Sequence, residues 1–448
     1  MRDDLETVTQ RLLDTARAAG ADTADALAIA GTSVNVDMRG GALELAERSE
    51  STDIGLRVFV GQRQATVSAS DLSDRTMQEM AERAVAMARE APEDPYAGLA
   101  DPEQLSAARD TSALELADPA PEPDPAEMEA EARAAEAAAL AHSGITQVER
   151  ASSGYGKRRV WIAGTNGFSA GYARTDRGIS CIAITGEGTG MERDYDSDVR
   201  VFAEDLRSPE EIGALAAERT LARAGARRAK TGACPVLFDE RIARSLISHL
   251  LSAANGAAVA RGASWLREAL GEDVLPAGIS LTEAPHRPRT AASRLFDAEG
   301  LPTAQREIVR DGVLQSYTLD LANARKLGMQ STASASRGVS SPPSPGITNV
   351  ALTQGDKSRD ALMAEMGTGL LVTGLIGSTI NPNTGDYSRG ASGLWIENGA
   401  PAYPVNEITI AGNLRDMLRS IVPANDAREW TSWVVPSLLV EGMTLAGD

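Results

Sequence analysis

Residues 53–70 read DIGLRVFVGQRQATVSAS, and this stretch decides the fold class of the N-terminal part of the chain. Its first half places an apolar residue at every second position, as a half-buried strand does: Ile54, Leu56, Val58 and Val60. Gly61-Gln62 then turns the chain into a second run of β-forming residues. The stretch therefore predicts an antiparallel hairpin.

Amphipathic helices are expected on both sides of this hairpin. One apolar stripe precedes it, made of Leu5, Val8, Leu12, Leu13 and Ala16. Another follows between residues 73 and 90, made of Met77, Met80, Ala81, Ala84 and Met87. Helices and antiparallel strands in this order predict an α+β domain, which we assign to residues 1–115.

A proline-rich boundary separates this domain from a middle segment. Residues 118–127 read DPAPEPDPAE, where alternating prolines disfavour helix and stiffen the connection. An Ala/Glu helix is expected next, followed by a β-meander with a hairpin at Asn166-Gly167. Ser208, with Pro209 and Glu211, forms a capping box that begins a helix expected to reach about Arg228. We assign residues 116–230 to this β-meander with flanking helices.

The remaining residues, 231–448, predict a β-rich C-terminal domain. Strand-like CPVLFDE is followed by a helix that carries Ile242, Leu246, Leu250 and Ala253. A further hairpin is expected at Asp311-Gly312, among many Gly, Ser and Pro loops. The whole chain is thus predicted to be α+β.

Composition limits what the chain can bind. It has 44 Lys and Arg against 63 Asp and Glu, a net charge of −19, which makes nucleic acid an improbable direct ligand. Three His and two Cys make a zinc site of imidazoles and thiolates almost impossible to assemble. The N-terminus lacks an apolar signal region, and the apolar run GLLVTGLIG is far shorter than the roughly 20 residues of a membrane span. We therefore expect a soluble, cytoplasmic protein without membrane attachment.

Isolated candidates for catalysis are weak. His249 lies on an apolar helix face and is typical of a core or interface residue, whereas His286 lies in APHRPRT, a cationic stretch typical of a solvated loop. The glycines of GEGTG, residues 186–190, precede a strand-like segment and indicate a turn rather than a phosphate cradle. The sequence contains neither a P-loop nor a G-x-S-x-G nucleophile motif.

The densest chemistry lies in residues 383–399, NTGDYSRGASGLWIENG. Small residues here let the backbone approach another strand or a ligand closely. The adjoining side chains supply an acceptor, an aromatic ring, a hydroxyl and a cation; with the following glycine they form a candidate peptide groove of Asp386, Tyr387, Ser388, Arg389 and Gly390. Two interpretations stay open: a strand edge that pairs with an extended peptide, or a glycine-rich bend inside a sheet.

This stretch, together with YPVNEITIAGNLRDML and PSLLVEGMTLAG that follow it, closely resembles the C-terminal signature of the PmbA/TldE family, also called modulator of DNA gyrase. Residues 293–303, 311–320 and 335–349 fit the same family in order. The resemblance covers nearly the whole chain. It implies a cytosolic metalloprotease of two homologous subunits, TldD and TldE, that cleaves unfolded or leader peptides.

In that family the TldD-type subunit holds zinc through His-Glu-x-x-x-His on a helix and a later Cys. The comparable helix here reads SLISHLLSAANG, with one His and no Glu behind it, and no Cys follows Cys234. The resemblance therefore implies the non-metal subunit, with no catalytic or metal-binding residue, no cofactor of its own and zinc in a TldD-like partner. The sequence leaves open whether the chain forms a homodimer without that partner.

Two rival hypotheses stay open. The chain could act alone as a peptide-binding or modulator protein, or it could be an enzyme with an unrecognised site around His249. Whether this subunit is itself an enzyme is left undecided by the sequence.

Overall fold

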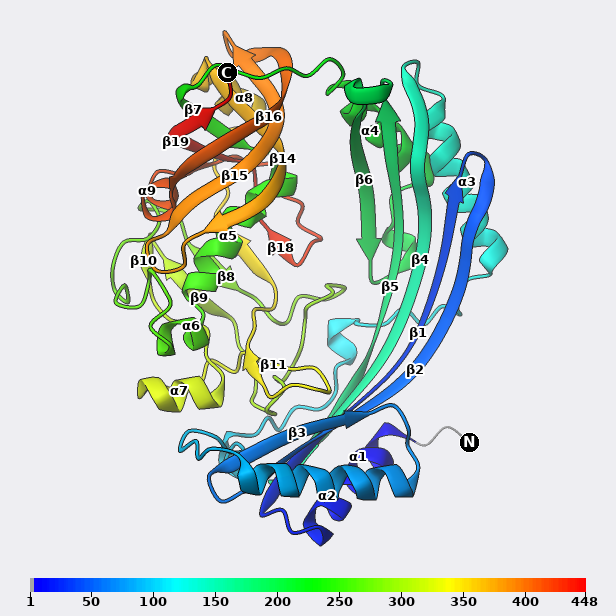
Figure 1. Ribbon diagram of the computed structural model, residues 1–448, viewed down its shortest axis with the longest axis vertical. Coiled ribbons are helices and arrows are strands. Elements are labelled where there is room, and N and C mark those ends of the chain that lie inside the picture. The colour runs from blue at the N-terminus through cyan, green and yellow to red at the C-terminus, as the bar shows by residue number, and fades with distance from the viewer. Residues whose placement is uncertain (1–3) are drawn as a thin grey trace.

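The structure is a computed structural model that describes residues 4–448. Its N-terminal half is built on one six-stranded antiparallel sheet of order β3-β2-β1-β4-β5-β6. The strands are β1 (Thr23–Arg39), β2 (Ala42–Val60), β3 (Arg63–Ala69), β4 (Ile145–Gly164), β5 (Ser169–Thr185) and β6 (Glu192–Arg200). The long strands bend along their length, so the sheet curves around the C-terminal half (Figure 1).

Helices cover the two ends of this sheet separately. At one end α1 (Leu5–Ala18) and α2 (Asp74–Glu90) pack on the hairpin of β2 and β3 and on the start of β1 (Figure 1). At the other end α3 (Pro125–Leu140) and α4 (Pro209–Leu221) pack on β4, β5 and β6. The hairpins predicted at Gly61-Gln62 and Asn166-Gly167 and the capping box at Ser208 are confirmed.

The strands of this sheet are longer than the sequence indicates. β1 and β2 each run without interruption through polar residues, including AERSESTD at residues 46–53. These residues pair with β1 on one side only, because β3 pairs with β2 from Ile54 onward. Most of them are exposed, so they need no apolar alternation. β1 also pairs with β4 along 14 positions from Asp25 to Met38, which places residues 1–115 and 116–230 side by side in one sheet.

Helix α4 ends earlier than predicted, at Leu221 rather than about Arg228. Gly225 adopts a positive φ of 73°, and Arg227 then forms a bridge with Val405 of the C-terminal half. The expectation failed because the chain leaves the helix to cross between the two halves. The C-terminal half is sheet-rich, as predicted, and its described residues form a six-stranded sheet, a five-stranded sheet and a two-stranded ladder.

One C-terminal sheet has the order β16-β15-β14-β7-β19-β17, and an extra β16–β19 pairing closes it on itself. Its strands are β7 (Gly232–Phe238), β14 (Gly369–Ile380), β15 (Asp386–Glu397), β16 (Ala400–Asn413), β17 (Val422–Pro423) and β19 (Leu438–Ala446). The other sheet contains β8 (Leu281–Glu283), β9 (Arg306–Arg310), β10 (Val313–Leu314), β13 (Val350–Leu352) and β18 (Trp433–Val434). A two-stranded ladder joins β11 (Ala335–Ser336) to β12 (Ser344–Pro345).

Five helices accompany these sheets: α5 (Glu240–Ala253), α6 (Gly256–Ala260), α7 (Leu321–Leu327), α8 (Arg359–Met366) and α9 (Leu414–Arg419). The apolar face of α5 joins the largest core cluster of the molecule, which also contains residues of β7, β14, β15 and β16. This packing fixes α5 directly against the strand that carries the candidate peptide groove. None of the described helices is long and apolar enough to cross a membrane.

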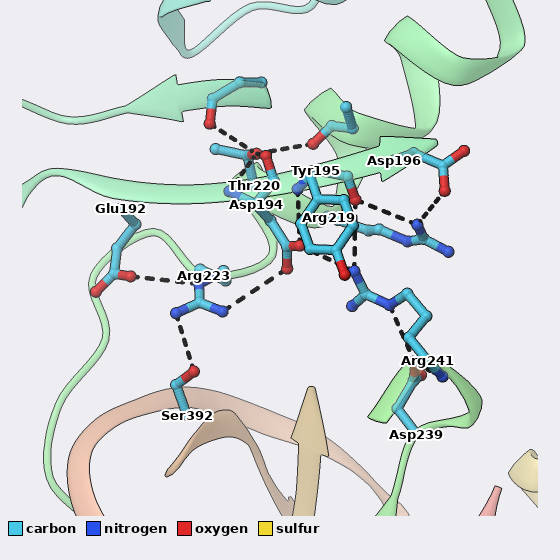
Figure 2. Close-up of polar contacts among 12 residues, drawn as sticks. Glu192, Asp194, Tyr195, Asp196, Arg219, Thr220, Arg223, Asp239, Arg241 and Ser392 are labelled. Atoms are coloured by element: carbon cyan, nitrogen blue, oxygen red, sulfur yellow. Dashed lines mark hydrogen bonds and ion pairs between the residues drawn. The ribbon is translucent and has the colours of Figure 1, made fainter. Parts of the chain in front are cut away.

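Contacts at several places hold the halves together, two junctions among them. At one, Arg337 of the C-terminal half pairs with Asp25 of β1, which also pairs with Arg57 of β2, and all three side chains are buried. The neighbouring Val339 rests on Gly55, where a Cβ atom would lie 2.1 Å from the Val339 carbonyl oxygen. The other junction joins β6 and α4 to α5 and β15 (Figure 2).

Candidate functional site

The candidate peptide groove begins β15, but β15 is not an edge strand. Residues 386–391 pair with β16 from Asp386↔Asn413 to Ala391↔Ile408, and Tyr387, Ser388 and Gly390 pair with β14. The strand-edge interpretation is therefore wrong at this position, because the backbone groups already bond to two neighbouring strands. The other interpretation, a glycine-rich bend inside a sheet, is right about the sheet: these residues lie between two strands, as a continuous strand with register shifts rather than a bend. At Gly393 a Cβ would lie 1.9 Å from the Leu371 carbonyl oxygen.

Side chains at the start of β15 therefore remain the only means by which it could contact a ligand. Tyr387 and Arg389, two positions apart, point to one face. Tyr387 is buried in the core beneath α5, and Arg389 is half-buried and donates through Nε to the Gly377 carbonyl oxygen at 2.7 Å. Asp386 is exposed and accepts hydrogen bonds from Thr384 and Asn413.

Helix α5 places His249 against Tyr387. Their ring centroids are 5.9 Å apart at an interplanar angle of 73°. Ser245, one helical turn before His249, lies on the same side of the helix. Within the described residues, three buried polar atoms here have no hydrogen-bond partner: Ser245 Oγ, His249 Nε2 and Tyr387 Oη. Buried polar atoms without partners are uncommon, so this cluster is a candidate for polar chemistry.

Burial sets the protonation of this cluster. It lowers the pKa of His249, and the positive charge of Arg389 lowers it further. Burial also raises the pKa of Tyr387 to about 12, although Arg389 opposes that shift. Both side chains are therefore neutral near pH 7. Sequence reasoning named His249, Tyr387 and Arg389 but neither their proximity nor Ser245, which only the packing of α5 on β15 reveals.

His286, the other weak candidate, occupies an exposed loop, as its sequence context indicates. Its Nε2 lies 3.0 Å from Thr303 Oγ1. The neighbouring Arg287 donates to the Thr431 carbonyl oxygen, and Arg289 pairs with acidic side chains of the N-terminal half, Glu115, Glu204 and Asp205. Arg289 thus joins the two halves, whereas Arg287 bonds within the C-terminal half.

The donor residues of this chain do not fit a zinc site. Among residues 4–448, no three His, Cys, Asp or Glu side chains gather in a way that could hold a metal ion. On α5, His249 has Ser245 four residues before it and Arg244 five residues before it. Cys181 is buried in β5, where burial raises its thiol pKa to about 12, and Cys234 is half-buried in β7.

A network of ion pairs connects this site to the N-terminal sheet (Figure 2). Acidic residues occupy alternate positions of β6, so Glu192, Asp194, Asp196 and Asp198 share one face. Arg223, just after α4, lies 3.3 Å from Glu192 and donates to Ser392 Oγ of β15 at 3.0 Å. Sequence reasoning missed this network. The alternation in ERDYDSDVR was the available signal, but its arginine partners come from distant segments.

A polar groove of about 800 Å³ lies on the sheet face opposite the helices, beside the loop that carries Val339. Small or polar residues line most of it, among them Gly31, Ser33, Asn35, Ser51, Ser152, Gly154, Gly156, Gly178, Ser180 and Ser197. Lys157, Arg158, Asp53 and Asp176 belong to the same lining. Such a surface offers many hydrogen-bonding groups.

Three parts of the chain match the PmbA/TldA metallopeptidase family: residues 24–88 its domain 1, residues 118–224 its central domain and residues 231–447 its C-terminal domain. The chain is 37% identical over 420 residues to the metalloprotease PmbA of Escherichia coli O157:H7, covering 93% of this chain and 90% of that protein.

Solved structures show the same fold. A proposed modulator of DNA gyrase from Bacteroides thetaiotaomicron aligns over 100% of both chains with a TM-score of 0.91 and 28% identity. TldE from Thermococcus kodakarensis aligns over 98% of this chain and 99% of its own, with a TM-score of 0.84 and 19% identity. The chain therefore belongs to the PmbA/TldE family of metalloprotease-related proteins.

Proposed function

We propose that this protein is the metal-free, TldE-type subunit of a heterodimeric peptidase whose zinc is held by a TldD-like partner. The observation that carries the proposal is the donor set of α5. His249 stands alone there, and the nearest polar neighbours on its side are a serine hydroxyl and a phenol rather than a carboxylate and a second imidazole.

A carboxylate base and two further ligands are what a catalytic zinc site requires. Ser245, His249 and Tyr387 supply neither, because the histidine is the only strong metal donor among them. The name metalloprotease that the Escherichia coli relative carries is therefore best reconciled with this chain if the metal belongs to another subunit.

The proposed substrate is an unstructured peptide. The polar groove on the N-terminal sheet supports this class, because hydroxyls, amides and exposed glycine backbone suit a main chain of any sequence. The side chains of Asp386, Tyr387, Ser388 and Arg389, with Gly390 beside them, remain our candidate for a contact with the peptide. Arg389 is the one cation of that group, and it is half-buried near the start of β15.

Reconstitution tests the proposal. The full chain is mixed with a TldD-like paralogue that carries His-Glu-x-x-x-His, and cleavage of an unstructured peptide is followed with and without a chelator. We expect cleavage by the mixture that the chelator abolishes, none by this chain alone, and zinc only in the paralogue. One zinc ion per chain in the isolated protein, measured by elemental analysis, would overturn the proposal.

The rival functions give different results in the same assay. A stand-alone peptide-binding protein would bind the peptide but add no activity to the paralogue. An enzyme centred on His249 would cleave without the paralogue, resist the chelator and lose its activity in His249→Ala.

A further inference from the structure

A second, smaller groove lies where β6 meets the C-terminal half. It measures about 230 Å³ and has three walls. The inner face of β6 contributes Tyr195, Ser197 and Val199, and helix α5 contributes Arg241 and Arg244. The segment before β19 forms the third wall with Arg428, Trp430, Thr431, Trp433 and Val435.

Large apolar side chains in this groove are left open to solvent. Val199 is 60% exposed, Tyr195 47% and Trp430 41%. Single exposed apolar residues are ordinary on a soluble protein, but three from two distant segments converge here on one concave surface. Arg200 lies over the Trp430 ring at 4.3 Å and holds it beside β6. The walls are therefore preformed for an apolar side chain.

Among the described residues, one arginine of the groove has no acidic partner. Each carboxylate that lines it has a basic partner: Asp196 pairs with Arg219, Asp198 with Arg200 and Glu240 with Arg428. Arg241 forms ion pairs with Asp194 and Asp239. Arg244 is exposed and, within residues 4–448, has no ion-pair or hydrogen-bond partner. The groove thus combines an apolar surface with an uncompensated guanidinium.

The volume of the groove limits the size of an anionic ligand that can enter it. Sites for drug-sized molecules measure roughly 300–1,000 Å³, so about 230 Å³ suits a single large residue. In an extended peptide, neighbouring side chains point to opposite faces, so an acidic residue and an adjoining apolar residue would not enter together. The last residue of a peptide carries both a carboxylate and its own side chain, and therefore meets both requirements at once.

We propose that this groove binds the C-terminal residue of a peptide, with the terminal carboxylate on Arg244 and an aromatic or aliphatic side chain against Tyr195, Val199 and Trp430. This binding site rests on the proposed function for one point, namely that the ligand is a peptide. Every peptide cleavage creates a new C-terminal carboxylate, so the site would retain one product of the reaction as readily as an intact peptide.

The test measures binding to the isolated full chain by isothermal titration calorimetry, without any paralogue. Three unstructured hexapeptides are compared: one ending in Phe with a free carboxylate, the same peptide amidated, and an amidated peptide with an internal Glu. We expect the free acid to bind at least about tenfold more tightly than either amide, because a charge-assisted Arg–carboxylate bond is lost in both.

Three variants test whether the peptide binds in this groove or at another exposed arginine. R244Q should lower the affinity for the free-acid peptide to that for the amidated peptide and leave the affinity for the amidated peptide unchanged. W430A should lower the affinity for both peptides. R83Q, an exposed arginine on α2, is the matched control and should change neither. Circular dichroism checks that each variant is folded.

Several outcomes would overturn the proposal: equal binding of acid and amide, preference for the internal Glu peptide, an unchanged free-acid affinity in R244Q, or no binding at all. These results leave the proposed function untouched, because that function is tested by chelator-sensitive cleavage in the mixture with the paralogue. Conversely, the groove could bind peptide ends as proposed in a chain that adds no activity to the paralogue.

Discussion

Arg241 Nη1 lies 2.9 Å from Asp194 Oδ1, and this pair ties the N-terminal sheet to the helix that carries His249. Both side chains are less than a tenth exposed, and Arg241 also lies 3.1 Å from Asp239, which caps the same helix (Figure 2). Two buried carboxylates therefore share this guanidinium, and each has one further arginine nearby: Arg223 lies 3.7 Å from Asp194, and Arg359 lies 3.0 Å from Asp239. The nearby carboxylates hold the pKa of Arg241 above its usual range against the effect of burial.

Removing this guanidinium should destabilise the protein strongly. Arg241→Met leaves Asp194 and Asp239 buried with less compensation, and loss of one partner of a buried pair costs about 3–5 kcal/mol. The free energy of unfolding in urea measures the effect. Arg193→Met is the control, because Arg193 forms an ion pair with Glu149 that is largely exposed. Such pairs contribute about 0–1 kcal/mol. Equal losses in the two variants would show that the junction contributes no special stability.

Gly55 should not tolerate a side chain. Its backbone φ is ordinary, but a Cβ would meet the carbonyl oxygen of Val339 at 2.1 Å. Gly55→Ala must displace the loop that carries Val339, at the junction where Arg337 pairs with Asp25. Overpacking of this kind costs about 1–3 kcal/mol. Gly232→Ala is the control, because Gly232 also lies in a strand and a Cβ there meets nothing within 4 Å. A thermal midpoint of Gly55→Ala equal to that of the control would contradict this contact.

The buried carboxyl of Glu299 should make stability fall as the pH rises. Burial, with the nearby charge of Asp297, raises the pKa of Glu299 from about 4.5 to about 8. The folded protein then keeps a proton that the unfolded chain loses, so this contribution is complete below about pH 4.5 and disappears as the pH passes about 8.

Glu299→Gln tests this dependence, because glutamine cannot ionise. Relative to the unmodified protein, its free energy of unfolding should increase between pH 5.5 and pH 8. Glu365→Gln, at an exposed pair with Lys357, should show a difference that is the same at both pH values. A Glu299→Gln difference that does not change with pH would contradict the assignment of this proton to Glu299.

The hydroxyl of Tyr387 should be dispensable for folding. It is buried without a hydrogen-bond partner in the described chain, so Tyr387→Phe removes a polar group that costs desolvation and returns no bond. We expect a free energy of unfolding that is unchanged or higher. If peptide affinity or activity of the reconstituted mixture nevertheless falls, the hydroxyl serves the ligand. A loss of stability above about 1 kcal/mol would instead indicate a bond that the hydroxyl makes in the folded protein.

Local patterns predicted much of the fold. The apolar stripes of α1, α2 and α5, the hairpins at Gly61-Gln62 and Asn166-Gly167, and the cap at Ser208 depend on neighbours in the sequence, so they are visible in it. One member of the α2 stripe was predicted wrongly: Met87 is 48% exposed, and the buried face continues through Ala88 instead. The polar middle of β2 was invisible because its strand character comes from pairing with β1.

The candidate site, like the fold, has features that the sequence predicts and features that only the tertiary structure reveals. The sequence by itself determined the family, the acidic charge and the absence of a second histidine near His249, because these are properties of residue identity and spacing. Only the tertiary structure decided that Tyr387 lies inside a sheet beneath His249 and that the acidic face of β6 meets arginines of α4 and α5. It also decided that Arg244 has no ion-pair partner among residues 4–448 in the groove that it lines with Trp430. Each of these depends on contacts between segments far apart in the chain, and local preference carries no information about them.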